Sequence, residues 1–169
     1  LNELDQLLNE KGLDTKIVFL IYVDLLWPPL TEKINNEKRF IMMFAPITRT
    51  YNRAFTPEKT LPEIPEYDRN NLEFPSDVSE NESFLKAWQE NYFKGDSFNF
   101  DYHFMWEHYY DPGYMDISRV LTEDIKNLEA IGLNGLISCQ TQRAFFPIGL
   151  GMIAMGRTLW DSNLKFEEI

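Results

Sequence analysis

Hydrophobic positions along the chain follow two patterns, helical spacing and short unbroken apolar runs. The leucines of residues 1–11 share one face at helical spacing, and nearly every position of the following run, 16–24, is apolar. A run that is apolar on both faces is typical of a buried strand in a parallel sheet. The pattern therefore predicts a helix and then a buried parallel strand.

The same two patterns continue to the end of the chain. An acidic, proline-rich stretch at 56–75 interrupts them and is predicted to be a long loop. After this loop, Ser79 and Glu82 form a capping-box pair that predicts the start of a helix. The elements predicted after the first strand are a turn of helix at 31–36, a strand at 39–45, a helix at 79–93, a strand at 97–106, a helix at 116–131, a strand at 133–140 and a helix at 147–160.

Two of these predicted helices carry a hydrophobic stripe that indicates which side is buried. In the helix that starts at Asp116, the stripe contains Ile117, Val120, Leu121, Ile125 and Leu128. In the last helix, Ile148, Met152, Met155 and Leu159 are expected to face inward.

Alternating strands and helices predict an α/β fold with a parallel sheet of about four strands covered by helices. The two versions of such a fold are a doubly wound sheet and a barrel. No strand is followed by a glycine-rich phosphate-binding motif, which weakens the nucleotide-binding versions. The chain also begins at Leu1 within an amphipathic pattern, so residues 1–169 are expected to be one partial domain, the C-terminal half of a (β/α)8 barrel.

Charge and composition exclude several classes of partner. A net charge of −11 argues against nucleic acid and against an anionic membrane surface. No apolar run approaches the roughly 20 residues that a membrane span needs. Cys139 is the single cysteine, so an internal disulfide is excluded, and a cytoplasmic location is slightly favoured.

Polar and aromatic residues gather where each predicted strand ends, and ligands bind at this end in parallel α/β folds. Asp101 and His103 share one face of a strand, either as a functional pair at the barrel mouth or as a buried structural pair. Arg49 is expected either to clamp a substrate or to pair with Asp24 or Asp101. The candidate catalytic carboxylates are, in order, Asp101, Asp24 and Glu107.

Further strand-end residues are candidates for binding a substrate, with packing or helix capping as the alternative for each. The two histidines, His103 and His108, need not converge, so neither a metal site nor a cofactor is expected. Cys139 is flanked by apolar positions and is expected to be a small core residue. The candidate substrate-binding residues are Tyr22, Trp27, Arg49, Tyr51, His103, Trp106, Tyr109, Gln140, Gln142 and Arg143.

Several motifs resemble a bacterial family, the proteins that carry domain of unknown function 4838. The resemblance rests on Tyr22 with Trp27-Pro28-Pro29, on the strand end 44–49, on the segment 132–140 and on 152–161. The most specific motif is Arg157-Thr-Leu-Trp-Asp161 within the last of these. The resemblance spans nearly the whole chain.

The resemblance implies a (β/α)8 barrel similar to hexosaminidase-like and α-glucuronidase-like glycoside hydrolases, and a carbohydrate ligand. The chain would then supply strands five to eight. In the related hexosaminidases the acidic catalytic residues lie at the end of strand four, so this chain alone is expected to be inactive. The alternative is a non-catalytic carbohydrate-binding or scaffolding barrel. A half-barrel also leaves two open sheet edges, which predicts either self-association or pairing with the missing N-terminal half.

Overall fold

A computed structural model describes residues 1–105, 111–139 and 149–169 of the chain. The strands form a four-stranded sheet in the order β1-β2-β3-β4, and every neighbouring pair is parallel. In these residues the strands are β1 (Ile17–Ile21), β2 (Phe40–Phe44), β3 (Ser97–Asp101) and β4 (Leu136–Ser138), and the α-helices are α1 (Asn2–Glu10), α2 (Val78–Asn91), α3 (Met115–Asn127) and α5 (Leu150–Trp160). The predicted α/β class with about four parallel strands is confirmed.

The link between β1 and β2 contains no α-helix. Two 3-10 helices, Val23–Leu26 and Glu37–Arg39, take the place of the helical turn predicted at 31–36. Leu26 is buried in the core, and its carbonyl accepts a hydrogen bond from the Trp88 indole at 2.9 Å. The link therefore covers part of the sheet itself.

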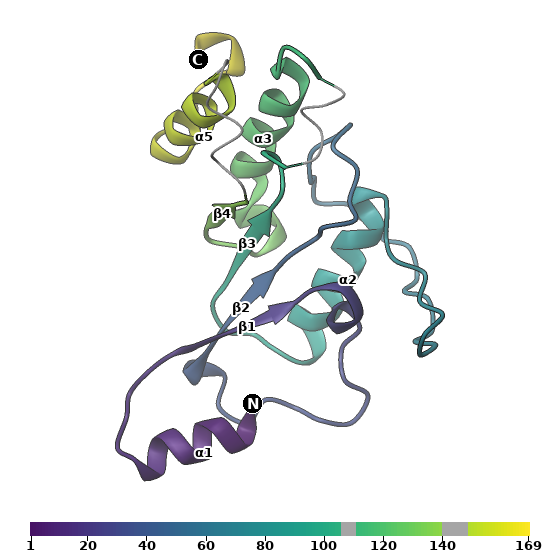
Figure 1. Cartoon of the computed structure of the whole chain (residues 1–169), viewed down its shortest axis with the longest axis vertical. Helices are drawn as coiled ribbons and strands as arrows, with labels where there is room; N and C mark the ends of the chain where they lie inside the picture. The colour runs from purple at the N-terminus through teal and green to yellow at the C-terminus, as the bar shows by residue number, and fades with distance from the viewer. Residues whose placement is uncertain (106–110, 140–148) are drawn as a thin grey trace.

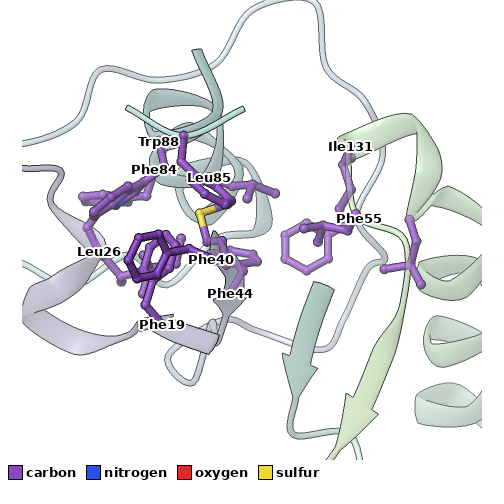
Figure 2. Close-up of a cluster of buried hydrophobic side chains, with 14 of the residues drawn as sticks. Phe19, Leu26, Phe40, Phe44, Phe55, Phe84, Leu85, Trp88 and Ile131 are labelled. Atoms are coloured by element: carbon purple, nitrogen blue, oxygen red, sulfur yellow. The ribbon is translucent and has the colours of Figure 1, made fainter. Parts of the chain in front are cut away.

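One face of the sheet packs against helices. Phe19, Phe40 and Phe44 point from β1 and β2 toward α2, where Phe84 and Trp88 meet them (Figure 2). Figure 1 shows α2 beside the middle strands, α1 at one end of the molecule and α3 with α5 at the other. Because side chains alternate along a strand, the other face presents the intervening residues.

Helix α2 begins at Val78, one residue before the predicted start at 79. The capping box is formed by Asp77 and Glu80, not by Ser79 and Glu82, because the Asp77 carboxylate accepts from the Ser79 N–H while Glu80 accepts from the Asp77 N–H. Arg53 adds an ion pair to Asp77 at 2.5 Å. Both Ser79 and Glu82 lie inside the helix.

The last helix buries only part of the face that was predicted. Met152 and Leu159 are exposed, whereas Met155, as predicted, faces inward and packs on the cluster of Phe104, Leu121 and Ile125. The buried positions of α5 are Gly151, Ala154 and Thr158. Ile148 lies outside the described residues. Small residues are needed here because a Cβ at Gly151 would come within 2.7 Å of the Phe104 ring. Close packing of α5 on α3 thus decides which face of α5 is buried. The hydrophobic stripe predicted for α3 is confirmed.

No helix among the described residues has both the length and the apolar character needed to cross a membrane.

Candidate functional site

The ends of β2 and β3 hold a buried cluster of charged side chains. Arg49 lies in the segment after β2, Asp101 is the last residue of β3, and His103 lies in the turn that follows. Each of these side chains, together with Asp124 of α3, is at most 3% exposed. Residues far apart in sequence thus meet at the carboxyl end of the sheet.

Arg49 is the centre of this cluster. Its Nη1 lies 3.1 Å from Oδ2 of Asp101 and 2.9 Å from Oδ2 of Asp124, and its Nη2 donates to the Arg53 carbonyl. The guanidinium also lies over the Phe55 ring, 4.1 Å from its centroid. Burial opposes the charge, but the two carboxylates outweigh it and raise the pKa of Arg49, so the side chain is a permanent cation.

Asp101 has a hydrogen-bond donor on each of its carboxylate oxygens. Tyr51 and the Tyr102 N–H donate to Oδ1, and Asn99 and Arg49 donate to Oδ2. Burial alone would raise the pKa of this carboxyl, yet attraction to His103 and Arg49, with the hydrogen bonds from Tyr51 and Asn99, lowers it to about 2. Asp101 is therefore ionised at neutral pH and fully engaged by protein groups.

The fourth member, Asp124, was not among the residues predicted from sequence. It accepts hydrogen bonds from Arg49 and from the Phe55 N–H, and its Oδ2 lies 2.7 Å from Nε2 of His103. A signal was present, because Asp124 falls on the hydrophobic stripe of α3 beside Leu121 and Ile125. A charged residue on a buried helical stripe needs a buried partner.

Asp101, His103 and Asp124 have the side chains of a metal site, and their potential ligand atoms lie within 4.8 Å of one another. Arg49, however, already places a positive charge between the two carboxylates. A divalent cation would have to displace this guanidinium or bind beside it, which repulsion between like charges disfavours. The geometry fits an ion-pair cluster better than a metal centre.

The cluster lies on the helix-covered face of the sheet. Asp101 shares its side of β3 with Ser97 and Asn99, which are buried, and it meets Asp124 through Arg49. This geometry agrees with the alternative in which Asp101 and His103 are a buried structural pair. Arg49 pairs with Asp101, one of the two carboxylates proposed for it, and Tyr51 joins the same network.

The opposite face of the sheet ends in tyrosines. Tyr22 follows β1 in extended conformation and Tyr102 follows β3. Both belong to one apolar cluster, which extends from Phe100 to Ile117 and Val120 of α3, and Tyr102 is buried in it. The Tyr102 ring lies 5.4 Å from that of Phe100. Burial, and next the neighbouring Tyr22, raise the pKa of Tyr102, so its hydroxyl remains protonated and able to donate a hydrogen bond. Tyr102 was not predicted as a site residue.

The other candidates near β1 are separated from the charged cluster. Asp24 is exposed on a 3-10 helix. Trp27 packs edge-on against Phe84 and donates a hydrogen bond to the carbonyl of Pro65, so it anchors the predicted acidic loop onto the core. Cys139 is partly buried at the end of β4. Six of the predicted residues lie outside the described ranges: Trp106, Glu107, Tyr109, Gln140, Gln142 and Arg143.

No family model, curated protein or solved structure matches this chain. The resemblance to domain of unknown function 4838 therefore stays a prediction from the sequence.

Proposed function

We propose that this chain is half of a (β/α)8-type barrel and that it binds carbohydrate at the carboxyl ends of its strands. The sequential all-parallel order β1-β2-β3-β4 supports the barrel, since doubly wound sheets reverse strand order at a switch point. Helices packed on one face, with a second face of apolar side chains, also fit one side of a barrel wall.

The observation that carries the binding proposal is the half-buried Tyr22 on the face opposite the helices. It lies at the carboxyl end of β1, in one cluster with the rings of Phe100 and Tyr102. Aromatic rings offer a flat apolar surface and, in tyrosine, a hydroxyl for hydrogen bonding. This combination suits a sugar, which has an apolar C–H face and a rim of hydroxyls.

A non-catalytic role fits the described residues better than hydrolysis. Glycoside hydrolysis normally uses two carboxylates, roughly 5–10 Å apart, that reach the scissile bond. Asp101 is 0% exposed and both of its oxygens are occupied by protein donors, so it is poorly placed to contact a substrate. The second candidate function, part of a glycoside hydrolase, is favoured by the exposed Asp24 at the end of β1.

Binding can be tested by isothermal titration calorimetry with two probes, chitotriose and glucuronic-acid-substituted xylo-oligosaccharides, chosen for the two related hydrolase groups. We expect the parent chain to bind one of them and Tyr22→Ala to weaken that affinity at least tenfold. Tyr67→Ala is the matched control, because Tyr67 is an exposed tyrosine of the acidic loop that packs on Trp27. Absence of binding to either probe, or equal loss in both variants, would refute the proposal.

The catalytic alternative makes a separate prediction. If the chain takes part in hydrolysis, Asp24→Asn must abolish release of reducing sugar while leaving the affinity for the oligosaccharide within twofold. Because this chain alone is expected to be inactive, turnover is measured on the protein with its N-terminal half-barrel, and a bound oligosaccharide that this protein leaves intact would support the non-catalytic role.

A further inference from the structure

A small cavity lies where the turn after β3 meets α3 and α5. Its lining includes His103 and Phe104 from the turn, Ser118 of α3 and Gly151 of α5. The volume of the cavity is about 10 Å³. Roughly 10–15 Å³ is the least that holds one water molecule, so the size of the cavity excludes a sugar or any other larger ligand.

Ser118 brings a buried hydroxyl to this cavity. The residue is 0% exposed, and its Oγ has no hydrogen-bond partner among the described residues. A serine or threonine inside a helix often donates to the carbonyl four residues earlier, as Thr122 does to the Ser118 carbonyl at 2.9 Å. Ser118 makes no such bond, and its Oγ lies 3.5 Å from the position that a Cβ on Gly151 would occupy. The hydroxyl therefore needs a partner from the cavity.

His103 brings a second buried atom without a partner, its Nδ1. The other ring nitrogen, Nε2, lies 2.7 Å from Oδ2 of Asp124 and donates to this carboxylate, which can only accept. Oδ1 of Asp101 lies 3.5 Å from Nδ1, at the limit of a hydrogen bond. Among the described residues, the charged cluster thus satisfies one side of the imidazole and leaves the other side unpaired.

We infer that the cavity is a binding site for one buried water molecule, which bridges Nδ1 of His103 and Oγ of Ser118. Water both donates and accepts hydrogen bonds, so it satisfies the hydroxyl and also Nδ1, whether the imidazole is neutral or protonated. Buried water molecules typically bind polar groups that would otherwise be unsatisfied. The bridge connects the charged cluster to the place where α3 and α5 pack together, and it is independent of the carbohydrate-binding proposal.

Gly151 keeps room for this water molecule. A Cβ added at this position would lie 2.7 Å from the Phe104 ring and 3.5 Å from Oγ of Ser118. An alanine here would therefore press on the ring and narrow the cavity below the size of a water molecule. The inference thus gives the glycine a second role besides the close packing of α5.

A high-resolution crystal structure of the 169-residue chain tests the site directly. We expect electron density for a water molecule at about 3 Å from both Nδ1 of His103 and Oγ of Ser118. A direct hydrogen bond between the two side chains, or no density between them, would overturn the inference.

NMR of the His103 imidazole nitrogens tests the same bridge in solution. Ser118→Ala removes one end of the bridge and should shift the Nδ1 resonance, while the Nε2 resonance stays in place because its bond to Asp124 is kept. Ser83→Ala is the matched control, since it removes a buried serine hydroxyl from α2 and should shift neither resonance. An Nδ1 resonance that Ser118→Ala leaves unchanged would contradict the bridge.

Magnetic relaxation dispersion of water oxygen counts the long-lived internal water molecules. Gly151→Ala should have one fewer than the parent chain, because the added methyl group excludes the bridging water. Gly156→Ala provides the control, since a Cβ on Gly156 of α5 would meet no atom within 4 Å. Equal counts in the parent chain and a folded Gly151→Ala variant would refute the site.

Discussion

Replacing Arg49 by methionine removes the cation that joins two buried carboxylates. Asp101 and Asp124 each lose an ion pair, at 3.1 and 2.9 Å, and both side chains are fully buried. Methionine retains most of the side-chain volume and can still pack against Phe55. The change therefore isolates the loss of charge and of hydrogen bonds from the loss of packing.

The expected cost is about 3–5 kcal/mol of unfolding free energy, because breaking a buried ion pair leaves an uncompensated charge in a site without solvent. A domain typically has about 5–15 kcal/mol of stability, so the variant should still fold in the absence of denaturant. Adding Asp101→Asn and Asp124→Asn to Arg49→Met removes the stranded charges. The triple variant should recover part of the loss.

Urea unfolding, followed by tryptophan fluorescence, measures this difference. Arg53→Met provides the control, because Arg53 also bridges two carboxylates, Glu58 and Asp77, but its side chain is 39% exposed. An exposed pair of this kind contributes about 0–1 kcal/mol. If Arg49→Met costs no more than Arg53→Met, the buried cluster does not hold the fold together, and the alternative in which Arg49 clamps a substrate regains support.

Two further predictions concern carboxyl groups and pH. The pKa of Asp101 is lowered to about 2 from 3.8, so the stability that it contributes is present above about pH 4 and is lost as the pH falls toward about 2. Tyr51→Phe, which removes one of its donors, should move the acid-unfolding midpoint to higher pH, and an unchanged midpoint would contradict this account. Burial raises the pKa of Glu82 above its ordinary value of 4.5, because the charged form is disfavoured inside the fold. The free energy of unfolding therefore falls as the pH rises above about 4.5 and this carboxyl group ionises. Glu82→Gln should therefore stabilise the chain at pH 7 by on the order of 1 kcal/mol in urea unfolding, and equal or lower stability would speak against it.

Elements with a clear hydrophobic period could be predicted from the sequence. The stripe of α3 and the unbroken runs of β1 and β2 match the structure because local geometry alone sets these periods. The capping box was misplaced because Asp77 with Glu80 and Ser79 with Glu82 both have the spacing of a capping pair, and the helix uses the first pair. In α5 the inward direction of Met155 was predicted correctly but those of Met152 and Leu159 were not, because close approach to Phe104 and α3 favours Gly151 and small neighbours over larger apolar side chains.

The charged pair at the end of β3 shows the same division. The alternation of side chains along a strand predicts that Asp101 and His103 point to the same side of the sheet. In the structure both belong to the buried charged cluster. The side of the sheet that carries them depends on where the crossover helices pack, which is a property of the whole chain. Asp124, their partner from α3, lies 21 residues beyond His103, so only the packed fold could bring them together.

The sequence by itself determined an α/β chain with four parallel strands and polar residues at their carboxyl ends, because strand and helix periods are local. The tertiary structure decided that Asp101 and Arg49 are buried under the helices, while Tyr22 is only half-buried at the end of β1 and Tyr102 is buried in the same cluster. Helix packing on one side of the sheet removes Asp101 and Arg49 from solvent, whereas Tyr22 remains partly accessible. That asymmetry makes the charged residues part of the framework and the tyrosines the candidates for binding.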